Sequence, residues 1–313
     1  KVGDLVFYDG SYSDVYDATK TVVGVCFYIN PYNKAQRLCV ALTNQSGGIP
    51  WGLYPEASNG ANGFNEIVLE DHPNYSVFDI PTIENITSRG LSTDYVTEET
   101  YRDETDAGDP DGFRLVTGAA ADIGFTKLTE AIGQYKKDDE IPIGLLKTLR
   151  IIQHRDLVLN DPSCDELPMP ADEGAGLYQG LVNCINNANQ LGAKYRQFYY
   201  PAASLCNAYQ PGVKSGETLA DCFKQGKWFL PAEGDLMRLY WLHRLGYGFN
   251  DDGVEQPLHN ASVLGLLAAF TNTWYWSSTE DSAGGAWNVN FSNGGTYFNY
   301  KCNGGAVRAV AAF

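Results

Sequence analysis

Residues 274–313 read WYWSSTEDSAGGAWNVNFSNGGTYFNYKCNGGAVRAVAAF and carry the clearest structural pattern in the chain. Apolar and polar residues alternate over 287–292, WNVNFS, a period of two that gives a strand one apolar and one polar face. Asn293-Gly294 then interrupts the alternation, and Asn-Gly between two such runs favours a type I′ hairpin turn, whose two central residues need positive φ. The sequence therefore predicts a β-hairpin with Thr296–Tyr300 as its return strand.

The composition of this hairpin is typical of a contact surface. Tyrosine offers a large amphipathic area with few rotatable bonds, while Ser, Gly and Asn adapt their hydrogen bonds to a partner. The alternative is an ordinary surface hairpin, because Tyr and Asn are also common at strand edges. We expect the large apolar residues around it to form a fixed scaffold: Trp274, Trp276, Trp287, Val307, Val310 and Phe313.

The motifs WYWSSTE, AWNVNF, NGG and VRAVAAF resemble the C-terminal half of C-type-lectin-fold domains of the DUF1566 and fimbrial-tip kind of gut Bacteroidetes. More narrowly, they resemble the variable proteins of diversity-generating retroelements, in which adenine-directed mutagenesis rewrites a C-terminal segment. The specific motifs lie from Gly226 onward, and a weaker likeness extends to the N-terminus. The resemblance implies an α+β protein with the C-type lectin fold and a long insertion between its N-terminal strands and its variable half.

The family mechanism makes a statement about residue types. Randomised adenines in an AAC codon yield codons ending in C, which do not encode Trp, Lys, Glu, Gln or Met. Trp287 and Lys301 belong to the excluded types and fall between the variable positions. The resemblance implies that the ligand-binding positions, all of permitted types, are Asp281, Ala283, Gly284, Gly285, Asn288, Ser292, Gly295, Tyr297, Phe298, Asn299, Tyr300, Cys302, Asn303 and Gly304.

Composition indicates a folded and strongly acidic protein. The 313 residues are 44% hydrophobic and 13% aromatic, and the formal net charge is -16. That charge repels phosphate backbones and anionic membrane surfaces, so we expect no nucleic-acid partner. No apolar run approaches the ~18 residues of a membrane-spanning helix, so direct membrane insertion is not expected either. Lys1 is not an initiator methionine, which is compatible with export and loss of a leader.

The rest of the chain reads as one elaborated domain over 1–313. Strand patterns separated by turns occupy 1–45, and the middle run, VVGVCFYI, is apolar on both faces, as in a strand inside a sheet. In the family resembled, the first and last strands lie side by side, which would pair this region with Val307–Phe313. Residues 46–170 read as an insertion with helices near Thr126–Tyr135 and Ile143–Gln153, for which a separate domain is the alternative.

Residues 171–273 are predicted to be the helical part, before a variable hairpin region over 274–313. One helix follows an apolar spacing from Leu177 to Leu191 and stops at Gly192. A second has Pro231 as its first residue and Gly246 after its end. Its inward face is Leu236, Leu239, Tyr240 and His243, and a third helix, capped by Asn260, turns Val263, Leu266, Leu267 and Phe270 inward.

Catalytic and metal motifs are sparse. His72, His154, His243 and His259 lack a ligand-spaced partner, and no GxSxG, Walker or dinucleotide-binding fingerprint occurs. Formylglycine-generating enzymes share the lectin-type fold but use a cysteine pair near the C-terminus, where this chain has Cys302 alone. The seven cysteines have no CxxC spacing and read as small buried hydrophobes rather than a disulfide framework, with Cys302 as the candidate free thiol.

Two acidic turns could hold calcium through oxygen ligands, although we expect no cofactor. They are DETDAGDPDG, residues 103–112, and NDDGVE, residues 250–255, and neither fits the EF-hand pattern. Solvated acidic turns without a metal are the alternative. Calcium-dependent sugar binding typically uses EPN- and WND-like motifs, where this chain has TED and WNV.

The sequence leaves several functions open. The first is a binding module that recognises a protein ligand, with a glycan as the alternative, at a cell surface as a lipoprotein or pilus-associated protein, or on a phage tail. The second is a hydrolytic enzyme that uses carboxylates of the insertion, among them Asp103, Glu104, Asp106, Asp109 and Asp111. The third is a pilus or fimbrial assembly subunit. The oligomeric state and the ligand's identity are not encoded in any motif.

Overall fold

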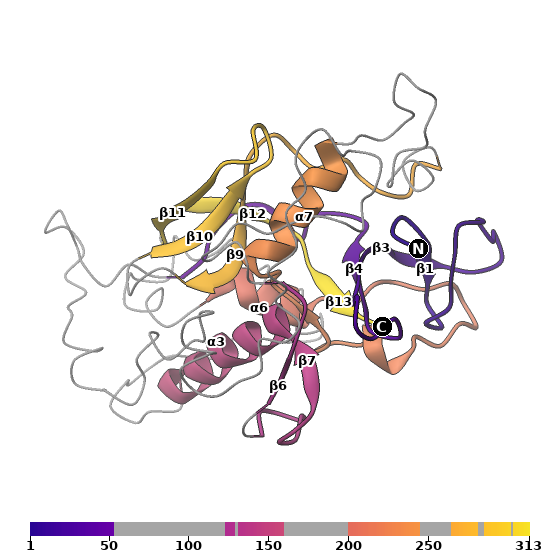
Figure 1. Cartoon of the computed structure of the whole chain (residues 1–313), viewed down its shortest axis with the longest axis horizontal. Coiled ribbons are helices and arrows are strands. Elements are labelled where there is room, and N and C mark those ends of the chain that lie inside the picture. The colour runs from indigo at the N-terminus through magenta and orange to yellow at the C-terminus, as the bar shows by residue number, and fades with distance from the viewer. Residues whose placement is uncertain (53–122, 129–130, 160–199, 245–263, 281–284, 302) are drawn as a thin grey trace, which may run out of the picture.

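The computed structural model describes residues 1–52, 123–128, 131–159, 200–244, 264–280, 285–301 and 303–313. This part of the chain is α+β, with two larger sheets, a two-stranded ribbon and three α-helices (Figure 1). Several expectations lie outside it, among them the helix over 177–191, the Asn260 cap of the third helix and the acidic turns 103–112 and 250–255. The same holds for Cys164, Cys184 and Cys302 and for the implied ligand positions Asp281, Ala283 and Gly284.

The N-terminal strands form one sheet with the end of the chain. Its order is β2-β1-β3-β4-β13-β8, and every pairing in it is antiparallel. The last strand therefore joins the N-terminal region, as the resemblance implied, but its neighbour there is β4 rather than the first strand. The strands are β1 (Leu5–Phe7), β2 (Tyr12–Ser13), β3 (Val22–Ile29), β4 (Arg37–Ala41), β8 (Trp228–Phe229) and β13 (Val310–Ala312).

Strand β3 is buried on both faces, as its sequence predicted. Val25 and Phe27 point into one apolar cluster, with helix α7 (Glu233–Arg244) and the second sheet. Val23 and Cys26 point into another, with helix α6 (Pro201–Ala208) and Trp228. Two cores on opposite faces leave no solvent-facing side for polar residues, which explains the continuous apolar run.

The second sheet presents the C-terminal hairpin. Its order is β11-β10-β9-β12-β5, so β11 is an edge strand and pairs only with β10 in the described part. All of its pairings are antiparallel except the parallel contact of β12 with β9. The strands are β5 (Ser46–Pro50), β9 (Trp274–Glu280), β10 (Gly285–Asn290), β11 (Thr296–Tyr300) and β12 (Gly304–Val307).

Three helices pack against these sheets: α3 (Ile143–Leu159), α6 (Pro201–Ala208) and α7 (Glu233–Arg244). Figure 1 shows α7 between the second sheet and strands β3 and β4. Leu236, Leu239 and Tyr240 of its predicted inward face are buried in the core that also holds Val289 of β10, whereas His243 is half-buried. The helices join the two sheets into one body that supports the hairpin.

The predicted start of α7 is wrong by two residues. The helix begins at Glu233 rather than Pro231, whose carbonyl accepts a hydrogen bond from the amide of Ser278 in β9. Ala232 is the N-cap, and its amide donates to the carboxylate of Asp235 at 2.9 Å. A side chain three residues into a helix that reaches back to the cap amide stabilises the helix start.

Two other predicted helices are absent from the described residues. Phe125–Lys127 is strand β6 and pairs with β7 (Glu140–Pro142), where a helix over 126–135 was expected. Gly133 has a φ of 56°, which a helix does not accommodate. Residues 264–270 form turns rather than the end of a helix, with a φ of 66° at Gly265. Leu267 and Phe270 are nevertheless buried, as predicted.

Candidate functional site

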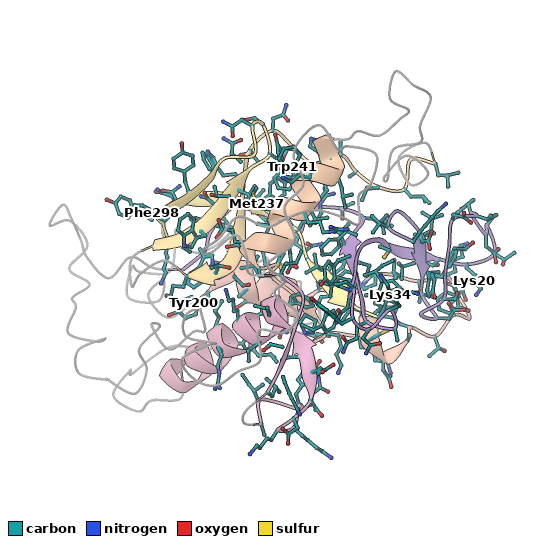
Figure 2. All side chains as sticks on the ribbon, viewed as in Figure 1. Lys20, Lys34, Tyr200, Met237, Trp241 and Phe298 are labelled. Carbon is teal, nitrogen blue, oxygen red and sulfur yellow. The ribbon has the colours of Figure 1, made fainter. Side chains whose placement is uncertain are left out.

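The hairpin exposes three aromatic side chains of a single strand, β11, at the edge of the second sheet. Tyr297, Phe298 and Tyr300 of β11 are 60%, 57% and 54% exposed. Figure 2 shows Phe298 at the outer edge of the second sheet. Three large aromatic side chains exposed on one short strand are unusual for a surface without a partner.

The aromatics lie on both faces of the hairpin, each beside a tryptophan. Phe298 is directly opposite Trp287 of β10, with ring centroids 6.3 Å apart. Tyr297 contacts Trp274 of β9 edge to face at 5.4 Å. Because successive side chains of a strand point to opposite faces, Phe298 and Tyr300 share one face and Tyr297 has the other.

A buried aromatic and a glycine fix the tip of the hairpin. Phe291 stacks on Phe270 at 4.6 Å and is 2% exposed. Gly294 has a φ of 75°, and a Cβ there would lie 2.2 Å from the Tyr240 ring of α7. The loop thus docks on α7 in a conformation that glycine adopts without strain.

The turn differs from the type I′ turn that Asn293-Gly294 predicted. Gly294 alone of that pair has positive φ. The amides of Asn293 and Gly294 both donate to the carbonyl of Asn290, and the amide of Asn290 donates to the carbonyl of Gly295. The connection is therefore a five-residue loop over 291–295, and the extra length lets Phe291 reach the core.

A buried ion pair closes the base of the hairpin. The Lys301 ammonium bonds to the Glu280 carboxylate, and these side chains are 1% and 3% exposed. Lys301 also lies over the Trp51 ring at 4.7 Å, and its carbonyl accepts the amide of Gly52. The indole of Trp51 donates to the carbonyl of Ser277 at 2.7 Å. The pair joins the residue that ends β9 to the residue that follows β11.

Sequence reasoning missed this ion pair. Glu280 and Lys301 are 21 positions apart, and no motif of the sequence analysis connects them.

The positions implied to bind ligand divide into four groups. Ser292, Asn303 and Gly304 are exposed together with Tyr297, Phe298 and Tyr300. Gly295 and Asn299 are half-exposed, whereas Gly285 and Asn288 are buried and do not belong to the surface. Asn288 points inward because it is opposite Trp276, itself fully buried, on the inner face of the sheet. The positions outside the described residues are Asp281, Ala283, Gly284 and Cys302.

A second polar cluster lies beneath the hairpin, between α3, α7 and β9. Lys147 donates to the hydroxyl of Thr279 at 3.1 Å, and Thr279 accepts the amide of Glu233. Burial lowers the pKa of Lys147 to about 7, against the attraction of the carboxylates of Glu233, Asp235 and Glu280.

Burial also raises the pKa of Asp235 to about 7, although the Ala232 amide and Lys147 act in the opposite direction. Asp235 is 1% exposed, and its hydrogen bond to the Ala232 amide caps the start of α7. Lys147 is fully buried and bonds from α3 to Thr279 of β9, which also accepts the amide of Glu233 in α7. This cluster therefore has a clear structural role in holding α3 and α7 to the sheet. The carboxylates expected for a hydrolytic site, residues 103–111, lie outside the described part.

His243 and the described cysteines also fit structural roles. His243 packs beside the stacked pair Phe270 and Phe291, with ring centroids 5.9 Å from each, and burial, assisted by Arg308, lowers its pKa. Cys26, Cys39 and Cys206 are buried free thiols, as the sequence indicated. Burial raises the pKa of Cys26 to about 12, which keeps this thiol protonated and unreactive.

One solved structure is weakly similar to this chain in its overall structure. No family model and no curated protein matches this sequence. A crystal structure of a fimbrial protein from Bacteroides ovatus is similar with a TM-score of 0.40 and 12% sequence identity. The similarity covers 100% of this chain and 49% of that one, so the chain spans about half of that protein's length. No described helix is long and apolar enough to cross a membrane.

Proposed function

We propose that this chain is a recognition protein that binds a protein ligand on a cell or virion surface through the exposed side of its C-terminal hairpin. The observation that carries the proposal is the contrast within the hairpin. Tyr297, Phe298 and Tyr300 are more than half exposed, whereas Phe291, Glu280 and Lys301 are buried. Side chains that bind and side chains that hold the fold occupy separate positions.

Aromatic residues suit this role because a few large anchors supply most of the affinity of a protein interface. Around them lie Ser292, Asn299 and Asn303, whose side chains can adapt their hydrogen bonds. The Asn299 side chain already bonds to the Tyr300 amide and to the Asn303 side chain, which orders this polar group.

The motifs WYWSSTE and VRAVAAF support the finer proposal that the frame is a C-type lectin fold, and the same separation supports a variable surface on it. A frame fixed by buried contacts tolerates exchange of exposed residues, since surface substitutions usually change stability by about ±0.5 kcal/mol or less. The fixed contacts here include Arg308, which lies over Phe270 and bonds to Asn44 and the carbonyl of Ala268. We place the protein at a surface, where such recognition would act.

The test compares two triple variants with the wild type. The first is Tyr297→Ala/Phe298→Ala/Tyr300→Ala. The control is Val15→Ala/Tyr16→Ala/Tyr32→Ala, which removes three exposed hydrophobic residues 69%, 40% and 64% accessible in the N-terminal part. Binding of the fluorescently labelled proteins to a panel of intact bacterial cells is measured by flow cytometry. Binding to immobilised virions is measured by fluorescence in a plate assay.

We expect the hairpin variant to lose binding and the control to keep it. Protease treatment of the target cells should abolish binding if the ligand is a protein, whereas a glycan ligand survives that treatment. Equal binding by the wild type and the hairpin variant would refute the proposal.

A further inference from the structure

Strand β11 leaves part of its backbone without a partner. In an antiparallel ladder, alternate residues of an edge strand direct N–H and C=O toward the neighbour, and the others direct them outward. The amide of Asn290 donates to the carbonyl of Gly295, which sets the phase of the β10–β11 ladder. From the register, Tyr297 and Asn299 face β10, and Thr296, Phe298 and Tyr300 face outward.

Two hydrogen bonds confirm that Tyr300 faces outward and cap its end of the edge. The amide of Tyr300 donates to the side chain of Asn299 at 2.9 Å, and its carbonyl accepts the amide of Asn303 at 2.9 Å. Thr296 and Phe298 have no such cap among the described residues. The edge therefore offers two backbone donors and two acceptors at alternate residues, about 6.8 Å apart, which is the repeat of a β-ladder.

Natural edge strands are usually protected by charged residues, proline or a bulge. The sequence of β11, TYFNY, contains no charged residue and no proline, and its pairing with β10 is regular. The aromatics flank the open backbone groups on both faces, with Phe298 and Tyr300 on one and Tyr297 on the other. An added strand would contact them with alternate side chains.

We propose that β11 binds an extended segment of another protein as an additional strand of the sheet, with Thr296 and Phe298 making the main-chain hydrogen bonds. This deepens the proposed function and rests on it. Main-chain bonds supply affinity in such complexes, and the side chains beside them supply specificity. The aromatic side chains can then vary while the backbone contact is conserved.

The net charge of the protein indicates which kind of segment β11 would bind. With a net charge of -16, two copies of the chain repel one another, which disfavours edge-to-edge pairing of identical protomers. The same charge attracts a basic segment, does not repel a neutral one and repels an acidic one. The partner is therefore a different protein with a neutral or basic extended segment.

The experiment uses dodecapeptides selected against the wild-type protein from a random linear library displayed on phage. Selected peptides are titrated against Thr296→Pro and its control, Thr296→Val. Proline removes the outward amide of residue 296 and leaves the ladder to β10 intact, whereas valine keeps that amide and a β-branched side chain. Phe298→Pro and Phe298→Ala form a second pair, in which both variants lose the ring and only one loses the amide.

We expect Thr296→Pro to weaken peptide binding about tenfold or more and Thr296→Val to stay within about twofold, because one hydrogen bond to a backbone amide is lost. Phe298→Pro should bind more weakly than Phe298→Ala. Amide hydrogen exchange of the wild-type protein, measured by NMR, tests the same main-chain contact without any substitution. The amides of Thr296 and Phe298 should exchange fast in the free protein and slowly with peptide bound.

The outcomes separate this inference from the proposed function. Peptides that lose affinity for Phe298→Ala but bind Thr296→Pro normally, without protecting the two amides, would overturn strand addition and leave the aromatic surface as the binding site. Peptides that bind all variants equally would overturn both. A library that yields no wild-type binder, or a wild-type dimer that Thr296→Pro dissociates, would overturn the assigned partner.

Discussion

The Glu280 carboxylate and the Lys301 ammonium form a buried ion pair across the base of the C-terminal hairpin. Twenty residues lie between them in sequence, from 281 to 300, and these include the exposed aromatics of β11. A charge left alone in the interior is costly, whereas an apolar pair of similar size can replace a buried ion pair at little or no cost. The Glu280–Lys301 ion pair therefore predicts how single and double substitutions change the stability of the protein.

Single substitutions in this pair should destabilise the protein far more than the double substitution. We expect Glu280→Leu and Lys301→Met each to lower the free energy of unfolding by about 3–5 kcal/mol. The double variant should recover a large part of that loss. Urea unfolding of the four proteins measures the coupling, and additive losses in the double variant would show that the two side chains act independently.

Substitution of Gly294 tests the anchoring of the hairpin tip. An alanine Cβ would overlap the Tyr240 ring and would have to adopt a φ of 75°. We expect Gly294→Ala to lower the unfolding free energy by about 1–3 kcal/mol. The control is Gly48→Ala, because a Cβ at Gly48 meets nothing within 4 Å. Equal melting temperatures of the two variants would contradict the packing of the loop on α7.

Two phenylalanines of one hairpin should respond in opposite ways. Phe291 is 2% exposed and lies in a cluster of aromatic rings, whereas Phe298 is 57% exposed. Phe291→Ala should cost about 3–5 kcal/mol, since it opens a cavity in the core. Phe298→Ala should change stability by about 0.5 kcal/mol or less. Thermal unfolding monitored by circular dichroism distinguishes them, and a similar loss in both would place Phe298 in the core.

The buried carboxyl of Asp235 should make stability depend on pH. Its pKa is raised from 3.8 to about 7 by burial, so between about pH 4 and pH 7 the folded state keeps a proton that the unfolded chain has lost. Stability contributed by this group is therefore full below pH 4 and decreases as the pH rises toward 7. The pKa of Lys147 is lowered to about 7, so this group is protonated in both states over most of that range.

Asp235→Asn removes this titration and keeps an acceptor for the Ala232 amide. The unfolding free energy of the wild type relative to Asp235→Asn should be highest near pH 4 and should fall by at most about 4 kcal/mol toward pH 7. Urea unfolding at several pH values measures the difference. A difference that does not change with pH would show that the carboxyl titrates normally.

The sequence predicted those elements in which the order of apolar and polar residues directly reflects which residues are buried. The apolar run of β3 and the inward face of α7 were recognisable because each residue there lies in a core. The hairpin and its exposed edge strand were recognisable from the alternation before Asn293 and the aromatics after it. These patterns are local and need no knowledge of distant contacts.

Contacts with distant residues decided what the sequence did not predict. Asn288 reads as a surface residue in WNVNFS but lies beside Trp276 in the interior. Thr126 and Lys127 fall in the helix predicted over 126–135, yet they belong to a strand because β7 pairs with them. The Glu280–Lys301 pair joins residues 21 positions apart, so neither residue alone indicates that both are buried.

The central claim is that the exposed aromatics of β11 bind a partner and do not hold the fold together. The most direct measurement is the unfolding free energy of Tyr297→Ala/Phe298→Ala/Tyr300→Ala together with its binding to target cells. We predict a stability within about 1 kcal/mol of the wild type and a loss of binding. A triple variant that unfolds, or one that stays folded and binds as the wild type does, would contradict the claim.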